Sequence, residues 1–146
     1  MDATDMDILA HLQENGRDSY REIAKTLGLS PATVMKRVKE MERTGLIRGY
    51  SVDIDLDRLG YDIHVIVDVR VAKGKLYQIE KKIARDRSVM MVFDNTGSFD
   101  ATVIARFKNR GGLDRFIKKL QTYDFVERTE TKLILNTIKD EGLKLA

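Results

Sequence analysis

The sequence predicts an α+β protein in two parts, with three short helices first and a β-α-β-β-α-β unit after them. Apolar residues up to Thr44 recur at helical spacing, whereas the first apolar stretch beyond residue 61 alternates with polar residues, as in a strand. The stretch between them, "DIDLDRLG", is polar. We therefore expect one domain over residues 1–52, a linker over 53–61 and a second domain over 62–146.

Composition limits the class of protein. Hydrophobic residues make up 42% of the 146 positions and charged residues 34%, which suits a folded chain with a soluble surface. No apolar run approaches the roughly 20 residues that span a bilayer, and the acidic N-terminus is the reverse of a secretory signal. The absence of cysteine excludes disulfides and thiolate metal sites. We expect a cytoplasmic protein with no membrane partner.

The first two helices are predicted from their ends. Thr4, with Asp7 three residues later, resembles a capping box, and Asn15-Gly16 follows the last apolar residue of the helical pattern. The second helix runs over about residues 19–27. Residues 28–30 then leave room only for a tight corner before the next helix.

The third helix has a firmly set beginning. Ser30 is a favoured N-cap, and Pro31 takes the first helical position, where its missing N–H costs nothing. Thr44-Gly45 ends the helix. At ~100° per residue, one narrow arc of this helix is apolar and is expected to face the core, and it consists of Val34, Val38 and Met41. Residues 46–54 alternate apolar and polar and predict a strand or a short β-ribbon.

The opposite side of the third helix carries small and basic residues. Residues 1–50 have no net charge, yet residues 31–50 hold five Lys/Arg against two Asp/Glu. A short helix, a tight corner and a second helix with a basic outer side form the pattern of a helix-turn-helix, in which the second helix enters the DNA major groove. Thr33 and Lys36 are the expected readers of base edges, and Arg37 could reach bases or phosphate. The other expected DNA-binding residues are Tyr20, Arg21, Ser30, Ala32, Lys39, Arg43 and Arg48.

The second domain begins with "DIHVIVDVRV" (residues 62–71), whose alternate residues are Ile or Val and predict a strand. A helix follows to about residue 87, and then strands over 88–94 and 99–107 joined by the turn "NTGS". A second helix around residues 113–120 and a strand over 126–138 complete the unit. This order predicts one antiparallel sheet with both helices on one face.

Apolar residues fall on both faces of the predicted sheet, although helices can cover only one. The candidates for the uncovered face are Ile66, Ile104 and Ile134, with either Met90 and Val92 or Met91 and Phe93. Covering a handful of such side chains, at roughly 25 cal/mol per Å², would contribute several kcal/mol. A symmetric partner sheet is the favoured cover; the alternative is that some of these residues lie at strand ends or under the linker.

Two motifs carry a resemblance to a known family. The first runs from Arg17-Asp18-Ser19 through "EIAKTLGLSPATVMKRVKEMERTGLIRGY" to "LGY" at residues 59–61, and the second is "TGSFD", a Gly-x-aromatic-Asp signature. In this order they resemble the Lrp/AsnC family of prokaryotic transcriptional regulators over essentially the whole chain. The resemblance implies an N-terminal winged helix-turn-helix and a ferredoxin-like (α/β sandwich) regulatory domain that forms homodimers and often octamers. It also implies an effector, usually an amino acid, bound where dimers meet.

The same resemblance indicates effector-site residues. Gly97 would expose backbone N–H groups to a carboxylate, Asp100 could pair with an ammonium, and Phe99 replaces the more usual tyrosine, so that a hydroxyl contact is absent. The full expected set is Asn95, Thr96, Gly97, Phe99, Asp100, Lys132 and Leu133. The alternative is a simple β-turn in which Asp100 caps backbone N–H groups.

The predicted function is a sequence-specific transcriptional regulator, not an enzyme, that binds near-palindromic double-stranded DNA and responds to a small metabolite. Alternatives are a structural three-helix bundle with a solvated charged side, or an amino-acid-sensing module with a vestigial helix-turn-helix. Sirohaem decarboxylases resemble the same two-domain fold, but they would need clustered histidines and arginines, and His11 and His64 lie far apart. Neither histidine has a neighbouring ligand at metal spacing, so we expect no metal and no cofactor.

Overall fold

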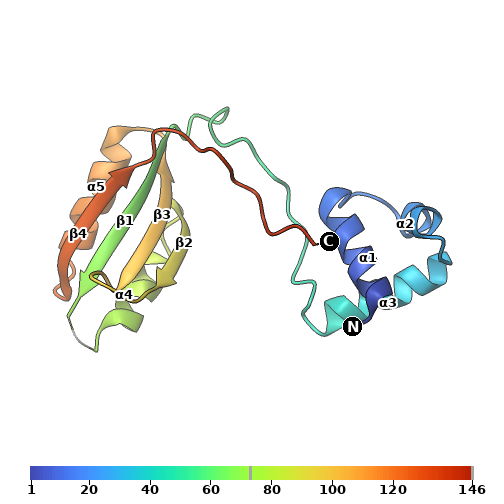
Figure 1. The fold of residues 1–146 in the computed structure, drawn as a ribbon. Coiled ribbons are helices and arrows are strands. Elements are labelled where there is room, and N and C mark those ends of the chain that lie inside the picture. The colour runs from blue at the N-terminus through green and yellow to red at the C-terminus, as the bar shows by residue number, and fades with distance from the viewer. Residues whose placement is uncertain (73, 146) are drawn as a thin grey trace. The chain divides into compact units, whose positions relative to one another are not determined.

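The computed structural model describes residues 1–72 and 74–145 (Figure 1). The chain forms two compact units: a helical unit, made of Met1–Asp53 and the segment from Lys139 onward, and a sheet unit, Ile54–Ile138. The helical unit contains α1 (Ala3–Glu14), α2 (Tyr20–Leu27) and α3 (Pro31–Arg43). The sheet unit contains β1 (Ile63–Val71), α4 (Leu76–Ile83), β2 (Val89–Asp94), β3 (Ala101–Phe107), α5 (Arg110–Gln121) and β4 (Val126–Leu133).

The first helix is capped by Asp2 rather than by Thr4, which corrects the sequence prediction. The Asp2 carboxylate accepts a hydrogen bond from the Asp5 N–H at 3.0 Å, and the Asp5 carboxylate accepts one from the Asp2 N–H at 2.9 Å. The same i, i+3 spacing of capping residues occurs two positions before Thr4 and Asp7, and this earlier pair forms the capping box.

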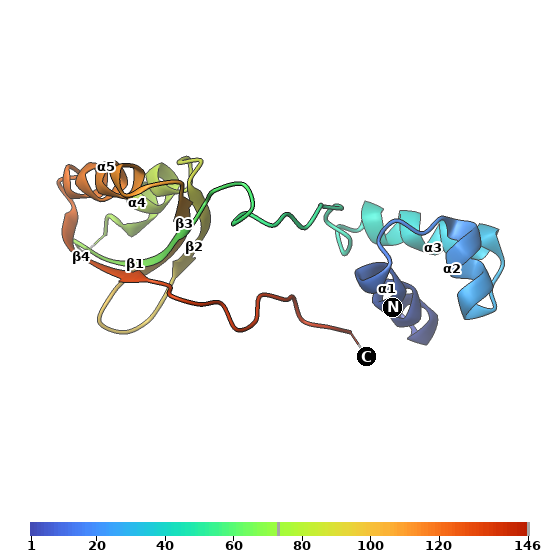
Figure 2. The same ribbon diagram turned by 90° about the horizontal axis from the view of Figure 1, so that it is seen from above.

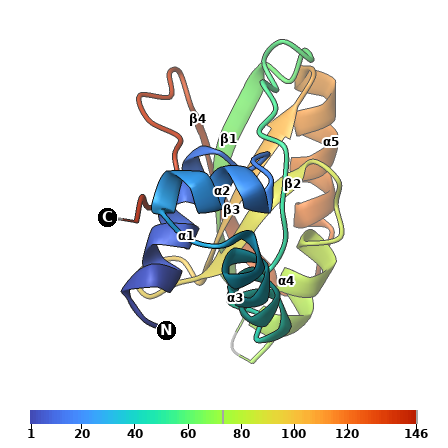
Figure 3. The same cartoon turned by 90° about the vertical axis from the view of Figure 1, so that its right-hand side faces the viewer.

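The corner between α2 and α3 has the predicted form (Figure 3). Gly28 ends α2 in the left-handed conformation, with φ of +66°, which glycine adopts without steric cost. The Leu29 N–H donates to the Ala24 carbonyl at 2.8 Å and closes the turn. Pro31 then opens α3 directly after its N-cap, Ser30.

The helical unit has its own apolar core, in which α3 buries the predicted arc. The buried members are Ile8, Ile23, Ala24, Val34, Val38 and Met41. Because three of them, Val34, Val38 and Met41, fix the rotation of α3 about its axis, the opposite side of α3 is turned to solvent.

Residues 46–54 form no strand, so the prediction of a strand or β-ribbon there is wrong for the described chain. The Ile47 N–H donates to the Met41 carbonyl at 3.0 Å and holds the start of this segment to α3. A strand needs a hydrogen-bonded neighbour, and alternation of apolar residues does not supply one. Val52 and Ile54 are accordingly exposed, by 81% and 54%.

The C-terminal segment, which the sequence-based assignment placed with the second domain, contacts the helical unit. Gln13 Nε2 donates to the Leu143 carbonyl at 2.9 Å, and Gln13 Oε1 accepts from the Leu145 N–H at 2.8 Å. The side-chain amide of Gln13 thus supplies both a donor and an acceptor to the backbone of this segment, the two groups that a paired strand would supply. The segment from Lys139 onward therefore belongs with the helical unit.

The sheet unit has the predicted β-α-β-β-α-β order. Its four strands lie in the order β2-β3-β1-β4, each antiparallel to its neighbours. Val67 in β1 lies opposite Val103 in β3 on one side and Thr131 in β4 on the other. Both helices, α4 and α5, cover one face of the sheet, as predicted (Figure 2).

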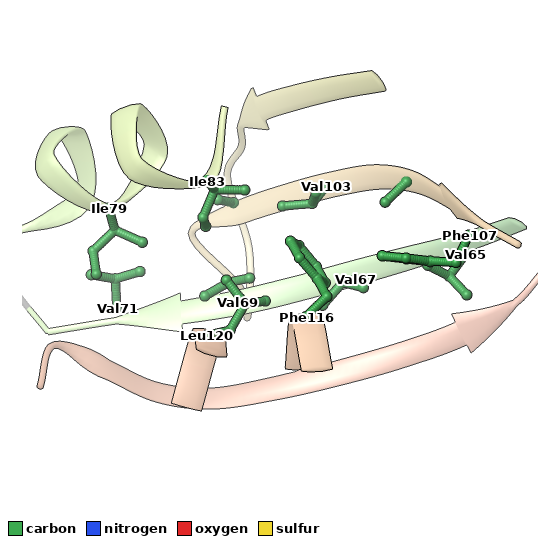
Figure 4. Packing of buried hydrophobic residues seen from close by; sticks show 12 residues of the cluster. Val65, Val67, Val69, Val71, Ile79, Ile83, Val103, Phe107, Phe116 and Leu120 are labelled. Atoms are coloured by element: carbon green, nitrogen blue, oxygen red, sulfur yellow. The ribbon is translucent and has the colours of Figure 1, made fainter. Parts of the chain in front are cut away.

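The layer between these helices and the sheet is the larger apolar core (Figure 4). Its buried members are Val65, Val67, Val69, Val71, Ile79, Ile83, Ala101, Val103, Ala105, Phe107, Phe116 and Leu120. Since every second residue of β1 and β3 is used here, the intervening residues lie on the other side of the sheet, which we call the open face.

The open face carries apolar side chains from three strands. Met91 in β2 lies opposite Ile104 in β3, and Ile104 lies opposite Ile66 in β1. Phe93 is two residues from Met91 and shares its face. Met91 and Phe93 are 48% and 49% exposed. Of the two sets that the sequence left open, the strand register therefore selects the one with Met91 and Phe93.

Candidate nucleic-acid interface and effector loop

The side of α3 opposite its core arc is open to solvent. Ala32, Lys36, Lys39 and Arg43 are exposed on it, and Thr33 is half-buried. These are residues expected to meet DNA, and they lie on the side that the buried arc leaves outward.

Two hydroxyls hold the N-terminus of α3. Ser30 Oγ accepts from the Thr33 N–H at 3.1 Å and lies 2.8 Å from Thr33 Oγ1. A hydroxyl has one donor and two acceptor positions, so Thr33 can share its hydroxyl with the cap and still offer a position to a base edge. The N-terminal end of a helix also favours a nearby phosphate.

Arg37, which was expected to reach bases or phosphate, is already paired within the protein. Its Nη1 donates to both carboxylate oxygens of Asp2 and to Oδ1 of Asp5, each at 2.8 Å. The guanidinium therefore joins the middle of α3 to the N-terminus of α1. Hydrogen bonds from Arg37 hold the pKa of Asp2 and of Asp5 below the ordinary value, and Asp5 and Asp2 in turn raise the pKa of Arg37.

The other basic residues of the interface differ in whether a carboxylate holds them. Arg43 pairs with Glu40 one turn earlier, with Nε 2.8 Å from Oε2 and Nη2 2.5 Å from Oε1. Tyr20 packs against the helical core and is half-buried. Four other expected DNA-binding cations are exposed and form no ion pair with any residue that the structure describes. They are Arg21, Lys36, Lys39 and Arg48.

The turn between β2 and β3 is tied to the end of β1. Asp100 Oδ2 accepts from the Val71 N–H at 2.8 Å, and the Asp100 N–H donates to the Val69 carbonyl at 3.0 Å. Asn95 closes the turn, since its N–H donates to the Asp100 carbonyl at 3.0 Å and its Nδ2 to the Phe99 carbonyl at 3.3 Å. Asp100 therefore caps a backbone N–H group, which is the alternative that we weighed against an effector contact. This cap uses one of its two carboxylate oxygens.

Gly97 and Phe99 shape the outer part of this turn. Gly97 has a φ of +118°, which glycine tolerates better than any other residue, and Thr96 beside it is exposed. The guanidinium carbon of Arg128, in β4, lies 5.6 Å from the centroid of the Phe99 ring, a cation–π contact.

Lys132 and Leu133 do not join the turn within one chain. Lys132 pairs with Ile66 of β1, whereas Asp100 bonds to Val69. Three residues of β1 separate these positions, ~10 Å at 3.3 Å per residue, and β3 and β4 lie on opposite sides of β1. The expected effector residues therefore form two groups in a single protomer.

Lys132 instead belongs to an ion-paired cluster on the open face. Its Nζ lies 2.5 Å from Asp68 Oδ2 and 3.5 Å from Glu130 Oε1, and Thr102 Oγ1 donates to Asp68 Oδ1 at 2.5 Å. Burial by itself raises the pKa of Asp68, but the hydrogen bonds from Lys132 and Thr102 outweigh burial, so this pKa lies below its ordinary value. Asp68 is therefore ionised at neutral pH although it is buried.

Sequence reasoning missed the acidic partners in both units. Asp2 and Asp5 lie 35 and 32 residues from Arg37, so no local spacing indicates the pairing. Asp68 did leave a signal, because a carboxylate within the apolar run "VIVDVRV" must find a cation or a hydrogen-bond donor.

Two kinds of feature are absent from residues 1–72 and 74–145. No helix in them has the length and apolar character needed to cross a membrane. No three His, Cys, Asp or Glu side chains in them lie close enough to hold a metal ion.

Comparison with known proteins identifies both parts of the chain. A family model for winged helix-turn-helix DNA-binding matches residues 1–48, and one for the Lrp/AsnC ligand binding domain matches residues 64–143. An uncharacterized HTH-type transcriptional regulator of Pyrococcus abyssi is 38% identical over 141 residues, which cover 97% of this chain and 96% of the relative. The HTH-type transcriptional regulator FL11 of Pyrococcus horikoshii is 31% identical over 140 residues, 96% of this chain and 93% of the relative.

Solved structures agree with the family models. Escherichia coli AsnC has a TM-score of 0.92 at 28% identity, with 99% of this chain and 98% of that chain covered. A Neisseria meningitidis transcriptional regulator solved in complex with L-Met has a TM-score of 0.89 at 26% identity, with 97% and 94% covered. These matches confirm the resemblance seen in the sequence: the chain belongs to the Lrp/AsnC family of transcriptional regulators and has a DNA-binding domain and a ligand-binding domain.

Proposed function

We propose that this regulator recognises near-palindromic double-stranded operators with the outward side of α3. The observation that carries the proposal is the exposure of Lys36 and Lys39, without a carboxylate partner among the described residues, behind a firmly capped helix start. Thr33 and Lys36 read base edges, while Arg21, Lys39 and Arg48 bind phosphates and so position the helix. In a dimer, two such helices enter successive major grooves ~34 Å apart, which requires half-sites one turn apart.

A homodimer, from which larger assemblies such as an octamer are built, forms through the open face of the sheet. The apolar side chains that support this are Ile66, Met91, Phe93 and Ile104. A second copy of the same face removes them from water at about 25 cal/mol per Å² of apolar area. Such a contact is isologous, so that one set of residues serves both protomers.

A small molecule of the amino-acid class modulates assembly or DNA binding. The match to a ligand-binding domain supports this, as does the related regulator solved with L-Met. Backbone N–H groups around Gly97 suit a carboxylate, and the Asp100 oxygen that the cap leaves unused suits an ammonium. Because the backbones of Lys132 and Leu133 lie ~10 Å or more away along the strands, we assign their contact with the effector to another protomer.

Selection of bound sites from random DNA, with and without a panel of amino acids, tests this function. The expected product is a near-palindromic site with half-sites one turn apart, and at least one amino acid should change its recovery. If no sequence is enriched, the assignment of α3 to the major groove is wrong. If a site is enriched but no amino acid alters DNA binding or thermal stability, the effector assignment is wrong.

A further inference from the structure

The helices of the sheet unit carry a second concentration of positive charge. Residues 74–88, which contain α4, and 108–124, which contain α5, together hold ten Lys/Arg against four Asp/Glu, a net charge of +6. The whole chain has a net charge of only +3, and residues 1–50 have none. The excess of positive charge therefore lies outside the helix-turn-helix, in segments that the DNA-binding proposal does not use.

These cations point outward. Nine of the ten are exposed, and among them are Lys81 and Lys82 on α4, Arg85 just after it, and Arg110 and Arg115 on α5. The inner sides of the same helices are occupied by the apolar core (Figure 4). We call the outer side of α4 and α5, with these basic residues, the basic layer.

The basic layer is one surface rather than two patches. Both helices cover the same face of the sheet (Figure 2). Lys119 Nζ, on α5, lies 3.1 Å from Asp86 Oδ2, in the turn after α4, and Lys82 Nζ lies 5.1 Å from the centroid of the Tyr123 ring, just after α5. These two contacts bring the C-terminal ends of the helices together, so the basic side chains at those ends adjoin one another.

Local roles explain only part of this charge. The last turns of α4 and α5 contain two lysines each, which the helix dipole stabilises. Arg85 follows the C-terminus of α4, where the dipole favours it, but Arg110 and Arg115, at the start and in the middle of α5, have no such role. Arg110 begins α5, where the dipole disfavours a cation, and within the described residues no carboxylate forms an ion pair with any of the three. On an ordinary solvated surface, positive and negative side chains are mixed. The excess of positive charge over α4 and α5 therefore indicates a surface suited to binding a polyanion.

We propose that the basic layer binds the phosphate backbone of the duplex that continues beyond the operator. The proposal rests on DNA binding by the helix-turn-helix, because that binding brings the duplex to the protein. A repeating row of phosphates matches an array of flexible lysines and arginines without any sequence preference. The layer thus adds affinity for long DNA, while α3 supplies the sequence information.

Three variants test the proposal. The layer variant combines Lys81→Gln, Arg85→Gln and Arg115→Gln, which removes three exposed charges and leaves polar side chains. The control variant makes the same change in charge at exposed positions outside the layer, with Arg58→Gln, Lys139→Gln and Lys144→Gln. The opposite variant, Asp114→Asn with Asp124→Asn, makes the layer more positive. Circular dichroism and thermal unfolding verify that each variant is folded.

Binding is measured across a salt series on two duplexes, the minimal operator and the same operator flanked by ~20 base pairs, two helical turns, on each side. On the long duplex, the layer variant should lose up to about 3 from the slope of log affinity against log salt, and about tenfold or more in affinity at low salt. On the short duplex it should bind as wild type does. The opposite variant should bind the long duplex more tightly than wild type, and the control variant should match wild type on both.

An unchanged ratio of long-duplex to short-duplex affinity in the layer variant overturns the proposal. The proposal is also overturned if the layer variant loses as much affinity on the short duplex as on the long one. The same holds if the control variant loses as much affinity as the layer variant. Either result would reflect the attraction of DNA to the net charge of the protein rather than contact with the layer. A change in oligomeric mass without a change in flank dependence assigns the layer to a protein partner and equally overturns it. Failure of the helix-turn-helix proposal looks different: wild type then prefers no operator sequence, yet the layer still governs the effect of duplex length.

Discussion

The basic side chains of α3 differ in what already surrounds each one. Lys36 and Lys39 are exposed and have no carboxylate partner in the described chain, whereas Arg37 bonds to Asp2 and Asp5. A phosphate would have to displace two carboxylates to reach Arg37. It would have to displace none to reach Lys39. The salt dependence of DNA binding should therefore come from the lysines.

Arg37→Ala should lower the thermal stability of the helical unit, because it removes the link between α3 and α1. It should leave the salt slope of operator binding unchanged, because Arg37 bonds to carboxylates rather than to phosphate. Lys39→Ala is the matched comparison, and it should reduce the slope by about 1 with little change in stability. Anisotropy titrations over a salt series, with thermal unfolding, measure both quantities. A slope reduced by about 1 in Arg37→Ala would show that DNA displaces the carboxylates.

Asp68 should give the sheet unit a stability that depends on pH. Its folded-state pKa lies below the unfolded value of about 3.9, so the contribution is fully present above that value and is lost as pH falls through the folded pKa. Asp68→Asn should therefore lower the free energy of unfolding by about 1–3 kcal/mol at neutral pH, and the difference from wild type should shrink below about pH 4. Urea unfolding at neutral pH and about pH 3 measures it. A difference that stays constant would mean that Lys132 and Thr102 do not stabilise the charge.

Partners of single residues were the hardest part to predict. The sequence led us to expect Arg37 at bases or phosphate, but whether it meets phosphate or carboxylate depends on how α1 packs. The family resemblance placed Lys132, on the last strand, near the turn between β2 and β3, whereas the structure pairs its side chain with Asp68. Pairings across tens of residues are set by tertiary packing, which spacing along a sequence does not report.

The helices and strands, in contrast, could be predicted from local sequence. A predicted strand formed wherever the fold supplied a partner strand. Ser30 caps α3 as predicted, since a capping hydroxyl needs only the N–H three residues on. The four strands of the sheet unit formed because each found a partner strand. Residues 46–54 have a strand-like pattern but no paired strand, so the pattern alone did not produce one.

The turn between β2 and β3 depends on the backbone conformation of Gly97. A Cβ at Gly97 would meet nothing within 4 Å, yet the φ of +118° is strained for an L-residue. Gly97→Ala should therefore cost about 1–2 kcal/mol in unfolding free energy through strain rather than through a clash. Gly142→Ala is the control, because Gly142 has equal space and no positive φ, and it should be close to neutral.

Denaturant unfolding of the two glycine variants measures this difference. Equal stability of both would mean that the turn relaxes to an ordinary conformation. Thermal shift with amino acids on the same proteins then reports whether the turn contributes to effector binding, because a changed turn should weaken the ligand-induced shift.

At the scale of the whole molecule, three surface regions differ in character. The outward side of α3 is basic behind a capped helix start, the basic layer is positive over two helices, and the open face of the sheet is apolar with a buried aspartate. Self-association belongs to this scale because it depends on the sheet as a whole rather than on any one strand.

Phe93→Glu should weaken the proposed dimer at least about tenfold, because an unpaired charge would be buried against the second copy. Phe93 is half exposed in the single chain, so the fold should survive the change. Tyr77→Glu is the control, since Tyr77 is 67% exposed on α4, outside the open face. Sedimentation velocity over a range of concentrations measures the change. A variant that dimerises as tightly as wild type would place the interface elsewhere.

Recognition of bases by the N-terminal half of α3 is the claim on which the rest depends, and its most direct test is a ratio of affinities. The ratio compares a selected operator with a random duplex of equal length at one salt concentration. Thr33→Ala and Lys36→Ala should each lower this ratio by about tenfold, within the 1–3 kcal/mol of a base contact. Lys39→Ala should weaken binding to both duplexes and leave the ratio as it is in wild type. An unchanged ratio in both Thr33→Ala and Lys36→Ala would contradict the assignment of α3 as the recognition helix.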